Sequence, residues 1–480
     1  MNWREGHLKK QFDAARGKPW TLAYASMDED CLSSGVLKVQ GDLPKDINGT
    51  FYRNGPARYE RGEGRYAHEW DGDGMVQAFR FRDGTVSHQG RYVRTRKFVQ
   101  ESAANEFQFN AFGSAIAGQS YLTADFDRLN AANISVCVHN QELLALWEPG
   151  SAYAMCLDSL ETLGVKRWGA CTLRPFSAHP KAEPGGLLWN FGCDPISGVL
   201  RVYGISARGE IQCSHQFAIA HLPPVHDFAV TRHHLVFVLS PLAVRIDRLQ
   251  AGRAWGSSFV RVAGQATRVL VVDKRSWALR WYEFAPTLCT HIGNAWEDTD
   301  GVIRFDCMCA SDPRWAMRGW LLMRGEYEHA RGAVPTFVEL RPDGACSASA
   351  MASVEAEFPV VDPALVGRRH AHMVCIERSA ARPGEVPGWD SLCCVDVERA
   401  CAQSYAFGKD WMVEEHVYAP DASRPGMPAR WLVGTALDLR SRRTVLSVFA
   451  ADAVAAGPVA QATLPYALPS GLHGTFHALA

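Results

Sequence analysis

Short strand-forming segments recur along most of this chain, and no comparably clear pattern of long helices accompanies them. The segments are rich in β-branched and aromatic residues and are mostly bounded by Gly, Pro, Asp or Asn. The clearest examples cover residues 75–81, 267–273, 334–340, 431–435 and 444–449. Such a series predicts an all-β sandwich, barrel or propeller. No repeat of about 40 to 50 residues is visible that would select the propeller from sequence alone.

The 480 residues contain no low-complexity linker that would divide them. Gly- and Pro-bearing stretches at 382–388 and 420–428 are typical of loops between strands. Since all-β folds often exceed the usual length of a domain, we expect one domain over residues 21–480, preceded by an N-terminal extension over residues 1–20.

Charge and composition exclude several classes of partner. The net charge of -1 and a pI near 7.0 leave no basic surface for nucleic acid or an anionic membrane. The N-terminus is polar, without the apolar core of a signal peptide, and no run of about 20 apolar residues could span a bilayer. We therefore expect a cytoplasmic protein. The 14 cysteines show no CxxC pair or disulfide-like spacing, so Cys307, Cys309, Cys393 and Cys394 are expected to be buried thiols in a reducing compartment.

Four histidines lie far apart, each flanked by prolines or glycines that suit a rigid, buried position. They are His179, His226, His291 and His473. Together they predict an all-imidazole metal site. A single histidine is more often a surface residue or a hydrogen-bond partner, and none of these has the close spacing of a local zinc motif. Imidazole ligands alone do not choose among Fe, Cu, Zn and Ni.

Further motifs connect these histidine segments to a known family. The chain carries F-Y-R-N-G-P (51–56), H-E-W-D-G-D-G-M (68–75), R-Y-V-R-T (91–95) and S-L-E-T-L-G (159–164). In this combination, from about residue 37 to residue 473, the sequence resembles the carotenoid cleavage oxygenases, non-haem iron dioxygenases that include the lignostilbene oxygenases. The resemblance implies a seven-bladed β-propeller with a cap of loops and short helices over the iron site. Blades arranged around an axis would bring widely spaced ligands to one point, whereas His68 belongs to the scaffold.

The resemblance also implies Fe(II) as the cofactor, and three glutamates that support the histidines. The matching positions are Glu148, Glu357 and Glu415. A metal-bound histidine normally donates its other N–H to a carboxylate or carbonyl, whereas most glutamates are solvated at the surface. Glu414 is adjacent to Glu415, and a slip of one residue on a strand would exchange the faces that they occupy. Replacing Glu414 with glutamine is expected to leave iron affinity and activity nearly unchanged.

Four positions bear on the substrate. Family members that cleave stilbenoids and phenylpropenes ionise the substrate phenol with a Lys, placed directly before the first glutamate, and an earlier Tyr. Here Trp147 and Ser114 stand at these positions. Ile134 replaces a Thr near the open coordination position, and Leu472 replaces the usual Phe. The form L-A-L-W-E (144–148) resembles that of carotenoid and apocarotenoid cleavers, whose neutral polyenes need an apolar tunnel.

The resemblance therefore implies O2-dependent cleavage of one double bond, in an apolar polyene or an aryl alkene, to two carbonyl products. No catalytic side chain is expected beyond the metal site. One alternative is a retinoid-type isomerohydrolase that uses iron as a Lewis acid without O2. Another is a binding scaffold without chemistry, against which the retained histidines and glutamates argue. The charged segment 240–256 predicts at most weak peripheral membrane contact.

Overall fold

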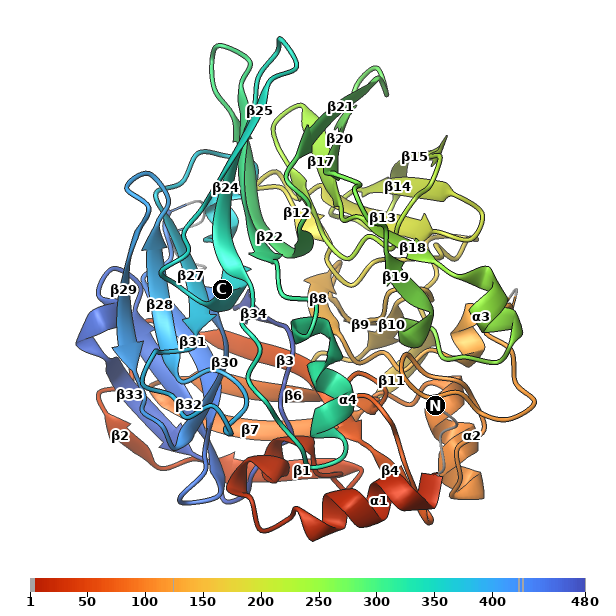
Figure 1. Cartoon of the computed structure of the whole chain (residues 1–480). Helices are drawn as coiled ribbons and strands as arrows, with labels where there is room; N and C mark the ends of the chain where they lie inside the picture. Colours follow the sequence, from red (N-terminus) through yellow and green to blue (C-terminus); the bar gives the residue numbers. More distant parts are fainter. Residues whose placement is uncertain (1–4, 124, 422–423, 425–426, 480) are drawn as a thin grey trace.

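The computed structural model describes residues 5–123, 125–421, 424 and 427–479. Over this part of the chain, seven sheets of four or five strands stand around a central axis and form a seven-bladed β-propeller (Figure 1). The fold implied by the resemblance is confirmed. The expected strands are present as well: residues 267–273 and 334–340 are β20 and β24, and the other three segments lie within β6, β31 and β32.

Blades two to six are each one stretch of chain whose four strands pair antiparallel in sequence order. In the fourth blade a two-stranded ribbon interrupts the series between the second and third strands. The first strand of each blade lies innermost, and several of these strands contact each other. The second blade contains β8 (Ser135–His139), β9 (Glu142–Leu146), β10 (Tyr153–Met155) and β11 (Thr162–Val165), and the third contains β12 (Lys181–Ala182), β13 (Leu188–Asp194), β14 (Val199–Ile205) and β15 (Ile211–Ala218). The fourth blade contains β16 (Phe228–Val230), β17 (His234–Leu239), β20 (Thr267–Asp273) and β21 (Leu279–Phe284), and the fifth contains β22 (Leu288–Glu297), β23 (Ile303–Ala310), β24 (Val334–Leu340) and β25 (Cys346–Ala350). The sixth blade contains β26 (Ala356–Val360), β27 (His372–Glu377), β28 (Ser391–Asp396) and β29 (Cys401–Ala406).

The first and last blades close the ring by exchanging strands from the two ends of the chain. The first blade runs outward from the C-terminal strand: β34 (Gly474–Ala478), β3 (Gly49–Arg58), β6 (Asp73–Arg82), β7 (Thr85–Tyr92) and β1 (Cys31–Val36). The last blade ends on an N-terminal strand: β30 (Trp411–Ala419), β31 (Trp431–Asp438), β32 (Arg443–Ala450), β33 (Pro458–Thr463) and β2 (Val39–Gly41). The ring therefore cannot open without breaking strand pairing.

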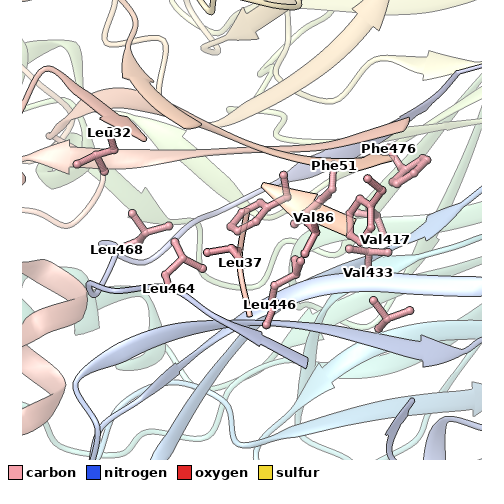
Figure 2. Close-up of a cluster of buried hydrophobic side chains, with 14 of the residues drawn as sticks. Leu32, Leu37, Phe51, Val86, Val417, Val433, Leu446, Leu464, Leu468 and Phe476 are labelled. Atoms are coloured by element: carbon pink, nitrogen blue, oxygen red, sulfur yellow. The ribbon is translucent and has the colours of Figure 1, made fainter. Parts of the chain in front are cut away.

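A shared hydrophobic core also joins the first and last blades (Figure 2). Phe51 and Phe476 on the first blade pack in one buried cluster with Val417, Val433 and Leu446 on the last. Burial of apolar surface stabilises such contacts by about 25 cal/mol per Å². This core fixes the two blades relative to each other and so holds the axis in place.

Helices in the described residues are short, and none is both long and apolar enough to span a bilayer. Phe12 and Trp20 near the N-terminus are buried in one cluster with Leu322 and Leu437, so this segment packs against the propeller. The domain boundary near residue 20 stays a prediction.

The remaining helices are α1 (Glu5–Ala14), α2 (Arg96–Ala104), α3 (Ile246–Gln250) and α4 (Arg318–Leu322), with the 3-10 turns η1 (Pro19–Tyr24), η2 (Phe126–Arg128), η3 (Gly256–Ser258), η4 (Trp315–Met317), η5 (Pro363–Leu365) and η6 (Val454–Ala456). Two short ribbons complete the structure: β4 (Glu60–Arg61) with β5 (Gly64–Arg65), and β18 (Leu242–Val244) with β19 (Phe259–Arg261).

Candidate metal centre

The four histidines singled out in the sequence meet at one point. The Nε2 atom of His226 lies 3.0 Å from that of His179 and 3.1 Å from that of His291. The ring of His473 is centred 4.7 Å from that of His179. One ring nitrogen from each of the four can be chosen so that all lie within 4.8 Å of one another. Such a group could hold a metal ion.

Their positions in the propeller explain how residues so distant in sequence converge. His179 and His226 lie two positions before the first residues of the innermost strands β12 and β16, His473 directly precedes β34, and His291 lies early in β22. The start of each innermost strand is the part of its blade that approaches the axis at one end of the ring. Four blades therefore present one imidazole each.

Carboxylates hold three of the four rings. The Nδ1 atoms pair with glutamates as follows: His291 with Glu357 at 2.7 Å, His473 with Glu415 at 2.9 Å, and His226 with Glu148. Each contact fixes the tautomer in which Nε2 keeps its lone pair for a metal. The glutamates come from the second, sixth and seventh blades, which supply no histidine, so all seven blades contribute.

The spacing of these donors fits a divalent transition metal. Two nitrogens about 2.1 Å from a common ion stand about 3.0 Å apart at a right angle and about 3.4 Å apart in a tetrahedron. The observed 3.0 and 3.1 Å match the right angle. Burial, followed by the neighbouring imidazoles, holds the pKa of His179 well below its usual range. That ring is therefore neutral, as a ligand must be.

Irregular strand pairing turns the supporting residues toward the centre. The ladder between β30 and β31 shifts register between Val413 and His416, and that between β26 and β27 shifts between Glu357 and Val360. A β-bulge places two residues opposite one and so bends the strand. At the shift in β30, Glu414 and Glu415 are both buried although they are adjacent.

Glu414 forms a buried ion pair with Arg53, which lies on β3 in the first blade. Its other carboxylate oxygen accepts a 2.8 Å hydrogen bond from the backbone N–H of Gly471. The expectation that replacing Glu414 leaves iron affinity and activity nearly unchanged stays a prediction, but these contacts give Glu414 a structural role that the sequence did not indicate. Strict alternation of faces, which would expose one of two adjacent residues, fails at this bulge.

Phe358 was not anticipated from the sequence. Its ring is centred 5.3 Å from that of His291 and 4.8 Å from that of His473. Its φ of 57° lies in the left-handed region, which an aromatic residue adopts only when the surrounding structure imposes it. No local sequence signal marks such a position, because the β26 bulge and the packing on two histidines determine it.

The histidine group opens onto a cavity of about 2290 Å³. Ile134, Trp147 and Leu472 line it, together with three of the four histidines and all three supporting glutamates. Ile134 lies beside the centre, since its carbonyl accepts a 3.3 Å hydrogen bond from the backbone N–H of His473. Contact of these three residues with substrate stays a prediction.

Ser114 does not lie on the cavity wall, and its expected place in the substrate pocket is corrected. It is fully buried, where its hydroxyl donates to Oδ2 of Asp71 at 2.6 Å and accepts from the N–H of Ala67 at 2.8 Å. The Ser114 side chain therefore stabilises the local loop through Asp71 and Ala67 and does not face the cavity. Tyr121 lines the cavity instead and stacks on Trp255, and its buried hydroxyl has no hydrogen-bond partner among the described residues.

Replacing Glu148 with glutamine should weaken metal binding by about ten- to a hundredfold, because the partner of His226 loses its charge. Metal affinity measured by competition with a chelator tests this. Glu355→Gln is the matched control: Glu355 also lines the cavity and faces a histidine, His329 at 3.3 Å, but that histidine is outside the group of four. Equal losses in the two variants would contradict a special role for Glu148.

Comparisons with known proteins agree with this geometry. A family profile described as retinal pigment epithelial membrane protein matches residues 24–478. The apocarotenoid-15,15'-oxygenase of Synechocystis sp. is 28% identical over 95% of this chain and 96% of its own length. The isoeugenol monooxygenase of Pseudomonas putida is 26% identical over 91% of this chain and 93% of its own. Among solved structures, cobalt-substituted Synechocystis apocarotenoid oxygenase superposes with a TM-score of 0.86 at 25% identity, covering 96% of this chain and 98% of that one.

Proposed function

Because this chain belongs to the retinal pigment epithelial membrane protein family, whose relatives include named oxygenases, we propose that it cleaves one carbon–carbon double bond of a carotenoid or apocarotenoid with O2. In this proposal His179, His226, His291 and His473 hold Fe(II). The observation that carries it is the group of four imidazoles, three of them backed by carboxylates, beside a large cavity. Bound ferrous iron would supply the redox chemistry that O2 requires to react with an alkene.

The side chains around the centre have a positioning role. Cleavage of an alkene by O2 places one oxygen atom on each carbon and gives two carbonyl groups without net transfer of a proton. The reaction therefore needs no general acid or base from the protein. Ile134, Trp147 and Leu472 would exclude water and orient the polyene, while Glu148 and its counterparts keep the imidazoles in place.

The cavity offers no base for a phenolic substrate at the position where related enzymes carry lysine, because Trp147 stands there. Tyr121 cannot replace it. Burial, and then the charge of Asp71, raises the pKa of Tyr121 well above its usual range, so that its hydroxyl stays protonated at neutral pH. A protonated hydroxyl can donate a hydrogen bond but cannot take up a proton.

We expect a 4-hydroxystilbene and its O-methyl ether to react at similar rates, since neither Trp147 nor Tyr121 converts the hydroxyl into an electron-donating phenolate. An apocarotenal should react faster, because it buries more apolar surface at about 25 cal/mol per Å². Initial rates with the three compounds test this. A marked preference for the free phenol without turnover of the apocarotenal would instead favour a stilbenoid or phenylpropene oxygenase, the activity suggested by the relative named for isoeugenol.

Isotopically labelled O2 tests the reaction itself. Cleavage should label both carbonyl products and should stop when O2 is removed. Isomerisation of a retinoid ester without O2 would replace this proposal with an isomerohydrolase. A protein that contains metal and binds the polyene, but neither cleaves the polyene nor isomerises a retinoid ester, would be a binding scaffold.

A further inference from the structure

Three cysteines form a compact cluster outside the histidine centre. Cys289 lies on β22, and Cys307 and Cys309 lie on β23 in the same blade. Their Sγ atoms all lie within 4.8 Å of one another, and those of Cys307 and Cys309 are 3.6 Å apart. Cys289 pairs directly with Cys309 across the ladder, and Cys307 lies two residues before Cys309 on β23. Since alternate residues of a strand share a face, the ladder brings the three thiols together.

We propose that this cluster is a second metal site, which binds one thiophilic divalent ion of the Zn²⁺ or Cd²⁺ type. Sulfurs about 2.3 Å from a common ion stand about 3.8 Å apart in a tetrahedron and about 4.0 Å apart in a triangle. The observed separations, 3.6 Å for one pair and no more than 4.8 Å for the others, bracket these values. Small side-chain rotations would complete the site.

An ion can reach this cluster through the cavity. Cys289 lines the cavity, whereas Cys307 and Cys309 are buried behind it against the neighbouring blade. The hydroxyls of Thr287 and Thr336 lie near the Cys309 sulfur and donate here to the carbonyls of Ala310 and Val334, at 3.1 and 3.3 Å. Rotation of either hydroxyl from its carbonyl to a bound thiolate would offset part of the cost of burying the charge of that thiolate.

Binding is a substitution and involves no oxidation. One divalent ion replaces three thiol protons, forms three metal–sulfur bonds, and leaves a complex with one negative charge and three released protons. Thiolates select soft ions, whereas imidazoles bind iron, cobalt and zinc alike. Two neighbouring sites that share β22 would therefore differ in their preferred metal.

Titration of the full-length protein with Cd²⁺ in a reducing, oxygen-free buffer tests the proposal. We expect one equivalent to produce the ultraviolet sulfur-to-cadmium charge-transfer band, which cadmium bound only to imidazole lacks. Loss of an outer-sphere partner weakens metal binding by about 10- to 100-fold, so loss of a sulfur ligand in Cys309→Ser should weaken it by at least about 100-fold. The matched control is Cys393→Ser, which removes another buried thiol from β28 in the next blade.

A stability measurement covers the case in which Cys309→Ser folds poorly. Cd²⁺ should raise the thermal unfolding midpoint of His291→Ala, which lacks a complete histidine centre, and of the same protein with Cys393→Ser added. When Cys289→Ser rather than Cys393→Ser is added to His291→Ala, Cd²⁺ should no longer raise the thermal unfolding midpoint. Absence of the charge-transfer band from the wild type, or its persistence in Cys309→Ser at the same affinity, would show that the cluster is only a set of buried thiols.

Discussion

Replacing His291 with alanine is expected to leave the protein without bound iron and with almost no activity. His291 would supply one of only four protein ligands, and its ring also joins the centre to Glu357 on the next blade. Iron analysis after purification should find about one iron ion per chain in the wild type and close to none in the variant. A full equivalent of iron in His291→Ala would show that the proposed ligand set is wrong.

His68→Ala is the control for this experiment. His68 is more buried than the four ligand histidines, but it packs among Trp70, Phe112 and Trp320. Burial, and then the charge of Arg318, lowers its pKa to about 3, so it is neutral like a ligand. The variant should therefore lose stability but keep its metal. The contrast separates loss of a ligand from general disruption of a buried histidine.

Much of the fold and of the site could be predicted from the sequence. Strands such as β20 and β24 were predicted to the residue, because β-branched runs ended by turn-forming residues depend on local chemistry alone. The four histidines required the family resemblance, since no spacing rule connects His291 with His473. Only the propeller, which brings the starts of the innermost strands to the axis, explains why they meet.

What the sequence could not provide depends on three-dimensional detail. A bulge buries Glu414 beside Glu415, and packing on two histidines holds Phe358 in the left-handed region. Ser114 was assigned to the pocket by counting positions, but its hydroxyl turns to Asp71. A register shift or a rotamer of this kind is decided by neighbours that are distant in sequence, and a single sequence carries no pattern for it.

The bulge in β30 that buries Glu414 leads to the second large expected effect, which is on stability. Glu414→Gln should lower the free energy of unfolding by about 3–5 kcal/mol, the usual cost of removing one partner from a buried ion pair. The side chains of Arg53 and Glu414 are only 6% and 9% exposed. Arg53 also donates to Oγ1 of Thr435 at 2.9 Å, so its guanidinium cannot turn toward water when the carboxylate is lost.

Denaturant-induced unfolding measures this loss of stability. Two further variants serve as comparisons. Glu161→Gln removes the carboxylate of an exposed pair with Arg91, so it should cost no more than about 1 kcal/mol. Glu415→Gln should chiefly weaken metal binding, because its carboxylate faces His473. Adjacent glutamates would then have different effects, one on stability and one on metal affinity. That difference follows from their partners, since Glu414 joins the last blade to the first through Arg53 whereas Glu415 supports the metal centre.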